Sequence, residues 1–214
     1  MVASDNDNDN ILKGYSMLLY FGGSFILGQP EESSVFELAS SDIFKKMPVR
    51  SHNPNFILAS SFLNKVNENG ELDYESILDD HLKLFGGMGV AKAPPYESVY
   101  LSHDHLMNQE QTLQVKRIYQ TYAWNPSLNG KIPEDHLGIE LQFLNMLLEK
   151  FIEIDDGVCK REVHTDMIKF IDNHIIKWLP EWNTNLQQNA VSPFYKGIGY
   201  LILASIQDVR SLLV

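Results

Sequence analysis

The sequence predicts an all-α fold, and three observations support this prediction. Large apolar residues recur every three or four positions along almost the whole chain, which is the spacing of one face of a helix. No stretch alternates apolar and polar residues for the length of a strand. Prolines and glycines divide the chain into segments of ordinary helix length. The 214 residues suffice for one globular domain, or for two small halves that share a core.

Turn residues mark the ends of the expected helices in the first part of the chain. Residues 1–10 form an Asp/Asn-rich tail that we expect to be disordered. A helix over about residues 10–28 stops near Gly28, and Glu31 and Glu32 favour the start of the next, because carboxylates stabilise a helix N-terminus. Asn53 is a predicted N-cap, followed by proline at the first helical position. The helices expected after the first cover about residues 31–47, 53–66, 73–85 and 108–124.

A hinge is predicted at residues 126–133, where prolines and a glycine interrupt the helical pattern. It would separate an N-terminal helical half, residues 11–125, from a C-terminal half, residues 134–214. The last helix, from Phe194 to Leu213, is apolar on nearly every side and should lie in the core. The other helices of this half are expected over about residues 134–154, 160–179 and 182–188.

Composition limits the classes of partner. Twenty-eight acidic and seventeen basic residues give a formal charge of -11, which disfavours nucleic acid and attracts a cationic ligand, although it could serve solubility alone. The single cysteine, Cys159, excludes an internal disulfide and indicates a reducing compartment. The acidic N-terminus is unlike an export signal, and Ile11–Leu27 is marginal for a membrane span. We therefore expect a cytoplasmic protein without stable membrane insertion.

Two proline-led polar turns each run into an apolar helical segment. In Lys131–Glu140, the residues Glu134, Asp135 and His136 fall on the first turn of a helix, where carboxylates are favoured. Capping alone would explain Asp135. Because His136 and Glu140 stand four apart and share a helix face, they could instead form an anionic mouth with Asp135 beside the hinge.

The other turn, Ala93–Tyr100, places Tyr96, Glu97, Ser98 and Tyr100 after a double proline. An exposed carboxylate between two aromatic rings suits a guanidinium group, through a charge-assisted hydrogen bond and a cation-π contact. Packing of the tyrosines and capping by Ser98 are the alternative. Neither turn has the spacing of a metal site, a phosphate loop or a nucleophile, so the pattern indicates binding rather than catalysis and predicts no cofactor.

These motifs resemble those of a known family. The segment Asp79–Gly89, followed by Ala93–Leu101, resembles the first signature of the TorD/DmsD family, and Pro133–Leu144 resembles the second. Phe194-Tyr195 is similar to part of the family's closing helix. The motifs stand in the right order, and the resemblance covers about residues 11–213. One departure is Tyr96, which stands where some relatives carry tryptophan or another residue.

The resemblance implies a cytoplasmic maturation chaperone that is not an enzyme. Such proteins bind the twin-arginine signal peptide and the apoprotein of a molybdopterin-dependent reductase, of the DMSO/TMAO reductase type, until its cofactor is inserted and before Tat export. The second signature is implicated in leader binding, which transfers to Glu134, Asp135 and His136. The first transfers to the residues of the other turn, which are Tyr96, Glu97, Ser98 and Tyr100.

Such a leader combines two guanidinium groups with an apolar stretch, so its receptor needs carboxylates beside an apolar groove. The acids Glu97, Glu134, Asp135 and Glu140 can supply the carboxylates. For the groove, the candidates are aromatic and aliphatic residues that could equally belong to the core, namely Tyr122, Trp124, Phe143 and Leu147. Some relatives bind guanine nucleotide, but Gly86–Gly89 lacks the lysine of a phosphate loop. The chain could be a monomer or a dimer that exchanges halves at the hinge.

Two other functional classes remain open from the residues. His103-Asp104-His105 and Asp135-His136 could belong to an all-α metal-dependent phosphohydrolase, although such dipeptides also arise by chance. Cys159 with His164 is a weaker candidate for nucleophilic catalysis. A purely structural helical module would differ from a leader-binding chaperone by having no preference for paired arginines.

Overall fold

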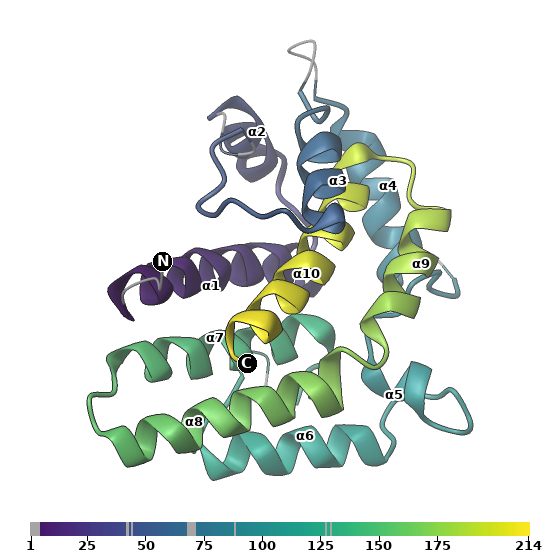
Figure 1. The fold of residues 1–214 in the computed structure, drawn as a ribbon. Coiled ribbons are helices and arrows are strands. Elements are labelled where there is room, and N and C mark those ends of the chain that lie inside the picture. Colours follow the sequence, from purple (N-terminus) through teal and green to yellow (C-terminus); the bar gives the residue numbers. More distant parts are fainter. Residues whose placement is uncertain are drawn as a thin grey trace.

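The computed structural model describes residues 5–41, 43, 45–67, 72–87, 89–126, 128 and 130–214. Over these residues the regular structure consists of ten α-helices and one π-helical segment, with no strand beyond a single bridged residue pair (Figure 1). The predicted all-α class is confirmed.

The first six helices reproduce most of the expected pattern. Their N-caps include Asn53, whose side chain accepts a hydrogen bond from the Asn55 amide at 2.9 Å, as predicted. The helices are α1 (Asp5–Leu27), α2 (Glu32–Ser40), α3 (Pro54–Leu63), α4 (Tyr74–Phe85), α5 (Glu97–Leu101) and α6 (Glu110–Thr121).

The remaining helices begin after the predicted hinge region. Asp156 and Ser192 cap two of them through side-chain oxygens that accept backbone hydrogen bonds. The elements are α7 (Leu137–Glu153), α8 (Gly157–Phe170), the π-helical segment Ile171–Ile175, α9 (Leu179–Asn189) and α10 (Pro193–Leu212).

Several boundaries differ from the sequence-based expectation. Helix α1 begins at Asp5 rather than near residue 10, so residues 5–10 of the tail that was expected to be disordered are helical; residues 1–4 lie outside the described residues. Helix α2 ends at Ser40, well before Pro48. Helix α5 was not predicted as a helix, because five residues are too few to show a period.

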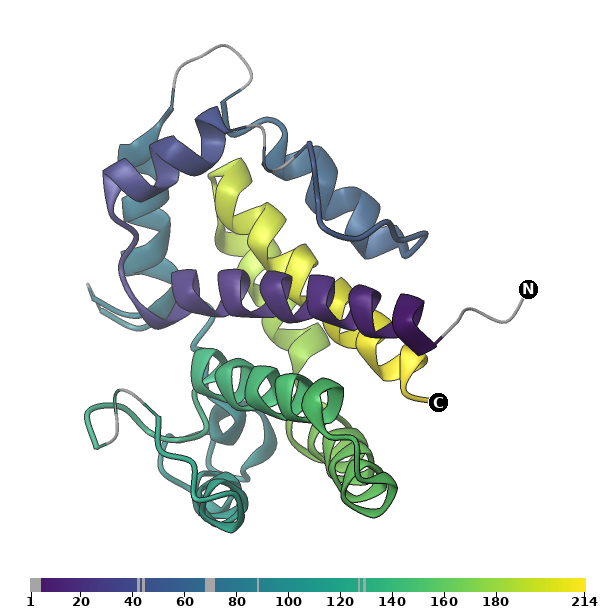
Figure 2. The ribbon, with the colours of Figure 1, turned by 90° about the vertical axis from the view of Figure 1, so that its left-hand side faces the viewer.

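The helices form two layers. Helices α5 to α8 form one layer. Helices α1 and α10 lie against it and form the other layer together with α2, α3 and α4 on their far side (Figures 1 and 2). Helix α10 packs against α3, α1 and α9, and α1 packs along α7. The burial of twelve α10 residues confirms that it is central to the core.

The packing crosses the predicted boundary at residues 126–133, since α1 and α3 from before it contact α7 and α10 from after it. The division into two halves and the movement of a hinge stay predictions. Among the described residues, no helix is long and apolar enough to cross a membrane.

Candidate functional site

The two proline-led turns meet in space. Tyr96 and His136 form an isolated antiparallel bridge. Around it, the Glu97 amide donates to the Asp135 carbonyl at 3.0 Å, and the Leu137 amide donates to the Pro95 carbonyl at 2.8 Å. Residues almost forty positions apart therefore start α5 and α7 side by side. The structure brings together the two motifs that the sequence singled out.

Asp135 is the side chain that fixes this junction. One carboxylate oxygen accepts a hydrogen bond from the Ser98 amide at 2.9 Å, and the other accepts from the Thr112 hydroxyl at 2.8 Å. The residue is fully buried. Asp135 thus caps α5, across the junction, and not the helix that follows it in sequence. The prediction that it caps its own helix is wrong.

His136 is the N-cap of α7. Its Nδ1 atom accepts a hydrogen bond from the Gly138 amide at 3.0 Å, so this nitrogen carries no proton. The ring lies edge-to-face on Tyr96, with 5.0 Å between ring centroids. Burial lowers the pKa of His136 to about 3, with a smaller contribution from His81. A neutral imidazole is therefore part of the folded structure.

Glu97 was expected to be exposed between two tyrosines, but only 1% of it is accessible. Its carboxyl oxygens lie 3.1 and 3.3 Å from Nδ1 of His174, which belongs to the π-helical segment. Burial raises the pKa of Glu97, and His174 opposes that rise. Sequence reasoning missed His174, because a π-helical turn inside an amphipathic segment leaves no mark in the residue spacing.

Glu140 lies fully buried one turn into α7. Neither of its carboxyl oxygens has a hydrogen-bond partner among the described residues. Burial raises the pKa of Glu140 well above its ordinary value, and the charges of Glu97 and Asp135 add to the rise. The fold therefore favours the neutral form of this carboxyl over the charged form. Because Asp135, His136 and Glu140 are all buried, they do not form the open anionic mouth that their spacing suggested.

Four residues of the predicted set remain partly accessible: Tyr96, Tyr100, Trp124 and Glu134. The side chain of Glu134 is 12% accessible, and Lys116 Nζ contacts its carboxylate at 2.6 Å. Tyr100 stacks on Trp178, and Trp124 packs on the Tyr119 ring.

The other predicted groove residues divide between core and surface. Phe143 and Leu147 are fully buried, so the core alternative is correct for them. Tyr122 is half-buried and donates its hydroxyl to Asp166 at 2.7 Å. The hydroxyl of Ser98 is buried and has no partner among the described residues, while its amide holds Asp135. Ser98 therefore contributes through its backbone.

The segment Asp79–Gly89 of the first signature contributes to a second junction, between other helices. The carboxylate of Asp80 accepts hydrogen bonds from the amides of Val191 and Ser192, at 2.7 to 3.0 Å, just before α10. His81 lies 2.9 Å from the Tyr195 hydroxyl, which itself donates to the Phe25 carbonyl. Nδ1 of His81 must then donate to Tyr195. Helices α1, α4 and α10 are joined in this way.

The residues proposed for catalysis do not come together. His103 and His105 lie exposed in the loop after α5, where they contact Asp104 and a backbone carbonyl respectively. Within the described ranges, no three His, Cys, Asp or Glu side chains are placed to hold a metal ion. Cys159 is exposed near the start of α8, and its pKa is raised by a hydrogen bond with Asp156. A raised pKa disfavours a thiolate nucleophile.

Comparison with known proteins gives a consistent result. The family model described as nitrate reductase delta subunit matches residues 56–184, more than half of the chain, and this range contains both polar turns. A chaperone protein TorD of Vibrio parahaemolyticus is 25% identical over 66% of this chain and 66% of its own length. Chaperone proteins TorD of Aliivibrio salmonicida and Vibrio cholerae are 23% and 27% identical, over 72% and 68% of this chain and 73% and 66% of their own lengths.

Proposed function

The chain belongs to the nitrate reductase delta subunit family, and from this premise we propose that it is a cytoplasmic chaperone for a molybdopterin-dependent reductase of the DMSO/TMAO reductase type. It binds the twin-arginine leader and the apoprotein of that reductase during cofactor insertion, before Tat export. The family is one of redox-enzyme maturation chaperones and not of enzymes, which disfavours the phosphohydrolase alternative.

The observation that carries the proposal is the bridge between Tyr96 and His136, which gathers both signatures at one place. The buried members of the set, Glu97, Asp135, His136 and Glu140, fix the starts of α5 and α7. In this role they position the site and do not touch the peptide. Because these acids position the site and do not contact the leader, they lie in the interior and not at the surface, where a cationic ligand would bind.

The partly accessible members, Tyr96, Tyr100, Trp124 and Glu134, then contact the leader. Glu134 is the carboxylate that an arginine can reach. At present Lys116 occupies it through one ammonium contact, and a guanidinium can replace that contact with two parallel hydrogen bonds. The aromatic rings accept the apolar part of the leader and can stack on a guanidinium plane.

The proposal is tested by calorimetry with a synthetic leader that contains two consecutive arginines before an apolar stretch. The wild-type protein should bind this peptide at least tenfold more tightly than the same peptide with both arginines changed to glutamine, because glutamine carries no charge for Glu134. Equal affinities for the two peptides would refute the proposed function.

A second measurement tests the assignment of Glu134. Glu134→Gln should weaken leader binding about tenfold, which corresponds to about 1.4 kcal/mol, without loss of helix content. Glu75→Gln is the matched control, since Glu75 is exposed on α4 and the change in net charge is the same. If both variants bind the leader like the wild type, Glu134 is not a contact of the leader.

A further inference from the structure

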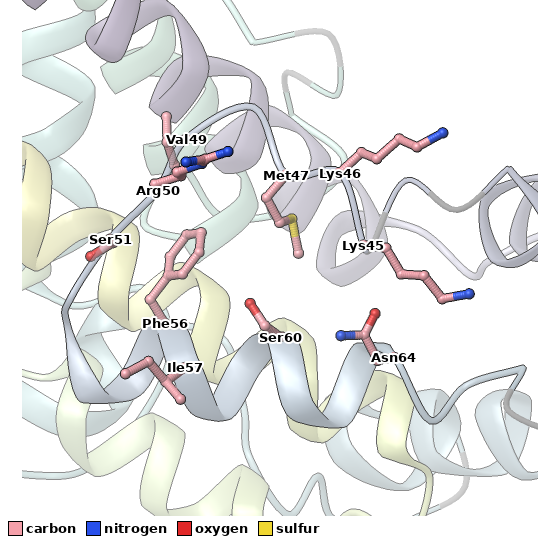
Figure 3. A pocket seen from close by; sticks show the side chains of 10 residues that line it. All are labelled: Lys45, Lys46, Met47, Val49, Arg50, Ser51, Phe56, Ile57, Ser60 and Asn64. Atoms are coloured by element: carbon pink, nitrogen blue, oxygen red, sulfur yellow. The ribbon is translucent and has the colours of Figure 1, made fainter.

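A surface of opposite charge lies away from the junction of the two signatures. Although the whole chain carries -11, three cations fall within six residues of the segment between α2 and α3. These cations, Lys45, Lys46 and Arg50, help to line an open pocket of about 580 Å³ between that segment and α3 (Figure 3). Helix α3 belongs to the layer opposite α5 and the start of α7 (Figure 1).

The lining of this pocket combines charge with apolar surface. Met47 and Phe56 point into the space between the segment and α3, and Ser60 and Asn64 face it from α3 (Figure 3). Lys46 and Arg50 are exposed, and neither side chain makes an ion pair or hydrogen bond with a described residue. Two positive charges are therefore available beside a polar wall.

A smaller apolar hollow of about 120 Å³ adjoins this pocket. Met47 lines both, so the two cavities share a wall. The other residues of the hollow come from α1, the segment between α2 and α3, and α10, and they are Met17, Leu18, Phe21, Ile43, Pro48 and Leu201. A ligand that spans both cavities must carry negative charge next to apolar groups.

We propose that this surface, formed by the basic pocket and the apolar hollow, binds an acidic amphipathic peptide segment of a partner protein. Carboxylates of the segment pair with Lys46 and Arg50, and an apolar side chain enters the hollow beside Met47. The net charge of the chain repels such a segment at long range. At physiological ionic strength charges are screened within about 8 Å, so the local cations dominate at contact.

The shape of the surface favours a peptide over an anionic membrane. Both cavities are concave, whereas a bilayer presents a broad face that cannot enter them. The site is separate from the proposed leader site, since it binds the opposite charge through other elements.

The test uses a fluorescent twelve-residue peptide with glutamate and leucine at helical spacing, measured by anisotropy at two salt concentrations. The wild type should bind it, and more weakly at the higher salt. The double variant Lys46→Glu, Arg50→Glu should lose at least tenfold in affinity. Lys169→Glu, Lys177→Glu is the matched control, because both lysines are exposed on the opposite layer and the charge change is identical.

Three outcomes would overturn the inference: no binding of the acidic peptide by the wild type, equal loss in the two double variants, or binding of phosphatidylglycerol vesicles in place of the peptide. The twin-arginine leader is titrated in parallel. Unchanged leader binding by Lys46→Glu, Arg50→Glu supports two separate sites. If the wild type binds the acidic peptide but does not prefer the twin-arginine leader to its glutamine version, the proposed function is refuted and the present inference is not.

Discussion

At the scale of the residue, the unusual feature of this protein is a carboxyl group buried without a hydrogen-bond partner. Burial and the nearby charges of Glu97 and Asp135 raise the pKa of Glu140 in the folded state. A raised pKa means that the folded state favours the neutral form. The stability that this proton provides is complete below the ordinary pKa of about 4.3 and is lost as the pH rises toward the folded value.

Glutamine at position 140 does not ionise, so the loss of folding stability at higher pH does not occur in Glu140→Gln. We expect Glu140→Gln to be more stable than the wild type at pH 7.5, by about 1–3 kcal/mol, and to approach it near pH 4.5. Urea denaturation at the two pH values measures the difference. Glu149→Gln, at an exposed position of the same helix, should change stability little at either pH. A destabilised Glu140→Gln variant at pH 7.5 would show that the carboxyl is charged in the fold.

His136 responds to acid in the opposite direction. Its folded pKa of about 3 lies below the ordinary value of about 6.5, so stability is present above pH 6.5 and is lost as the pH falls toward 3. Protonation would also remove the acceptor that caps α7.

The variant His136→Asn separates this titration from that of the carboxylates. Asparagine keeps an N-cap oxygen but does not titrate. We expect the stability of the wild type to fall more steeply between pH 6.5 and 4 than that of His136→Asn, by about 2–3 kcal/mol over the interval. Denaturation curves at half-unit steps would test this, and parallel pH profiles would contradict it.

At the scale of the element, two aspartates of the signatures hold helix starts that are distant in sequence. Asp135 caps α5, and Asp80 accepts hydrogen bonds from the two residues that precede α10. We expect Asp80→Ala to cost about 2–4 kcal/mol, because it leaves the Val191 and Ser192 amides without their acceptor. Its neighbour Asp79 is exposed, so Asp79→Ala removes the same charge and should cost under about 0.5 kcal/mol. Equal costs of the two substitutions in guanidinium denaturation would show that the hydrogen bonds of Asp80 do not stabilise the fold.

Elements were predictable from sequence to different degrees. Long helices, including α10, were found because their apolar residues recur at helical spacing, and the start of α3 was found because an Asn-Pro pair marks it. Helix α5 was not found, because five residues are too few to show a period. The π-helical segment was predicted only as part of a continuous helix over about residues 160–179, because a single wider turn leaves no mark in the residue spacing. His174 lies in that segment, so its contact with Glu97 could not be predicted.

The same limit applies to the candidate site. The sequence singled out Glu97 in one turn and Asp135 and His136 in the other, but it suggested that their side chains are exposed. Their burial depends on the pairing of α5 with α7 across almost forty residues, and neither helix encodes that pairing in its own pattern. Local rules describe which face a residue occupies and not what covers that face.

At the scale of the whole molecule, a close approach of two backbones helps to join the two layers. Helix α1 runs along α7 (Figure 2), and Gly23 and Gly138 are close neighbours across these two helices. A Cβ atom at Gly138 would lie 2.9 Å from the Gly23 carbonyl oxygen and 3.0 Å from the Cβ of Leu27. Neither contact can be relieved by a side-chain rotation, so a methyl group must move one helix away from the other.

We therefore expect Gly138→Ala to destabilise the protein by about 1–3 kcal/mol through overpacking. Because Gly138 follows the His136 cap by two residues, the same shift would disturb the junction of α5 and α7 and lower leader affinity. Gly157→Ala is the matched control. Its new methyl group meets only a flexible arginine end at 3.6 Å, and the helix start should gain about 0.4–1 kcal/mol. Chemical denaturation with leader calorimetry on both variants decides the matter, and a Gly138→Ala protein as stable as the wild type would mean that the layers can separate without cost.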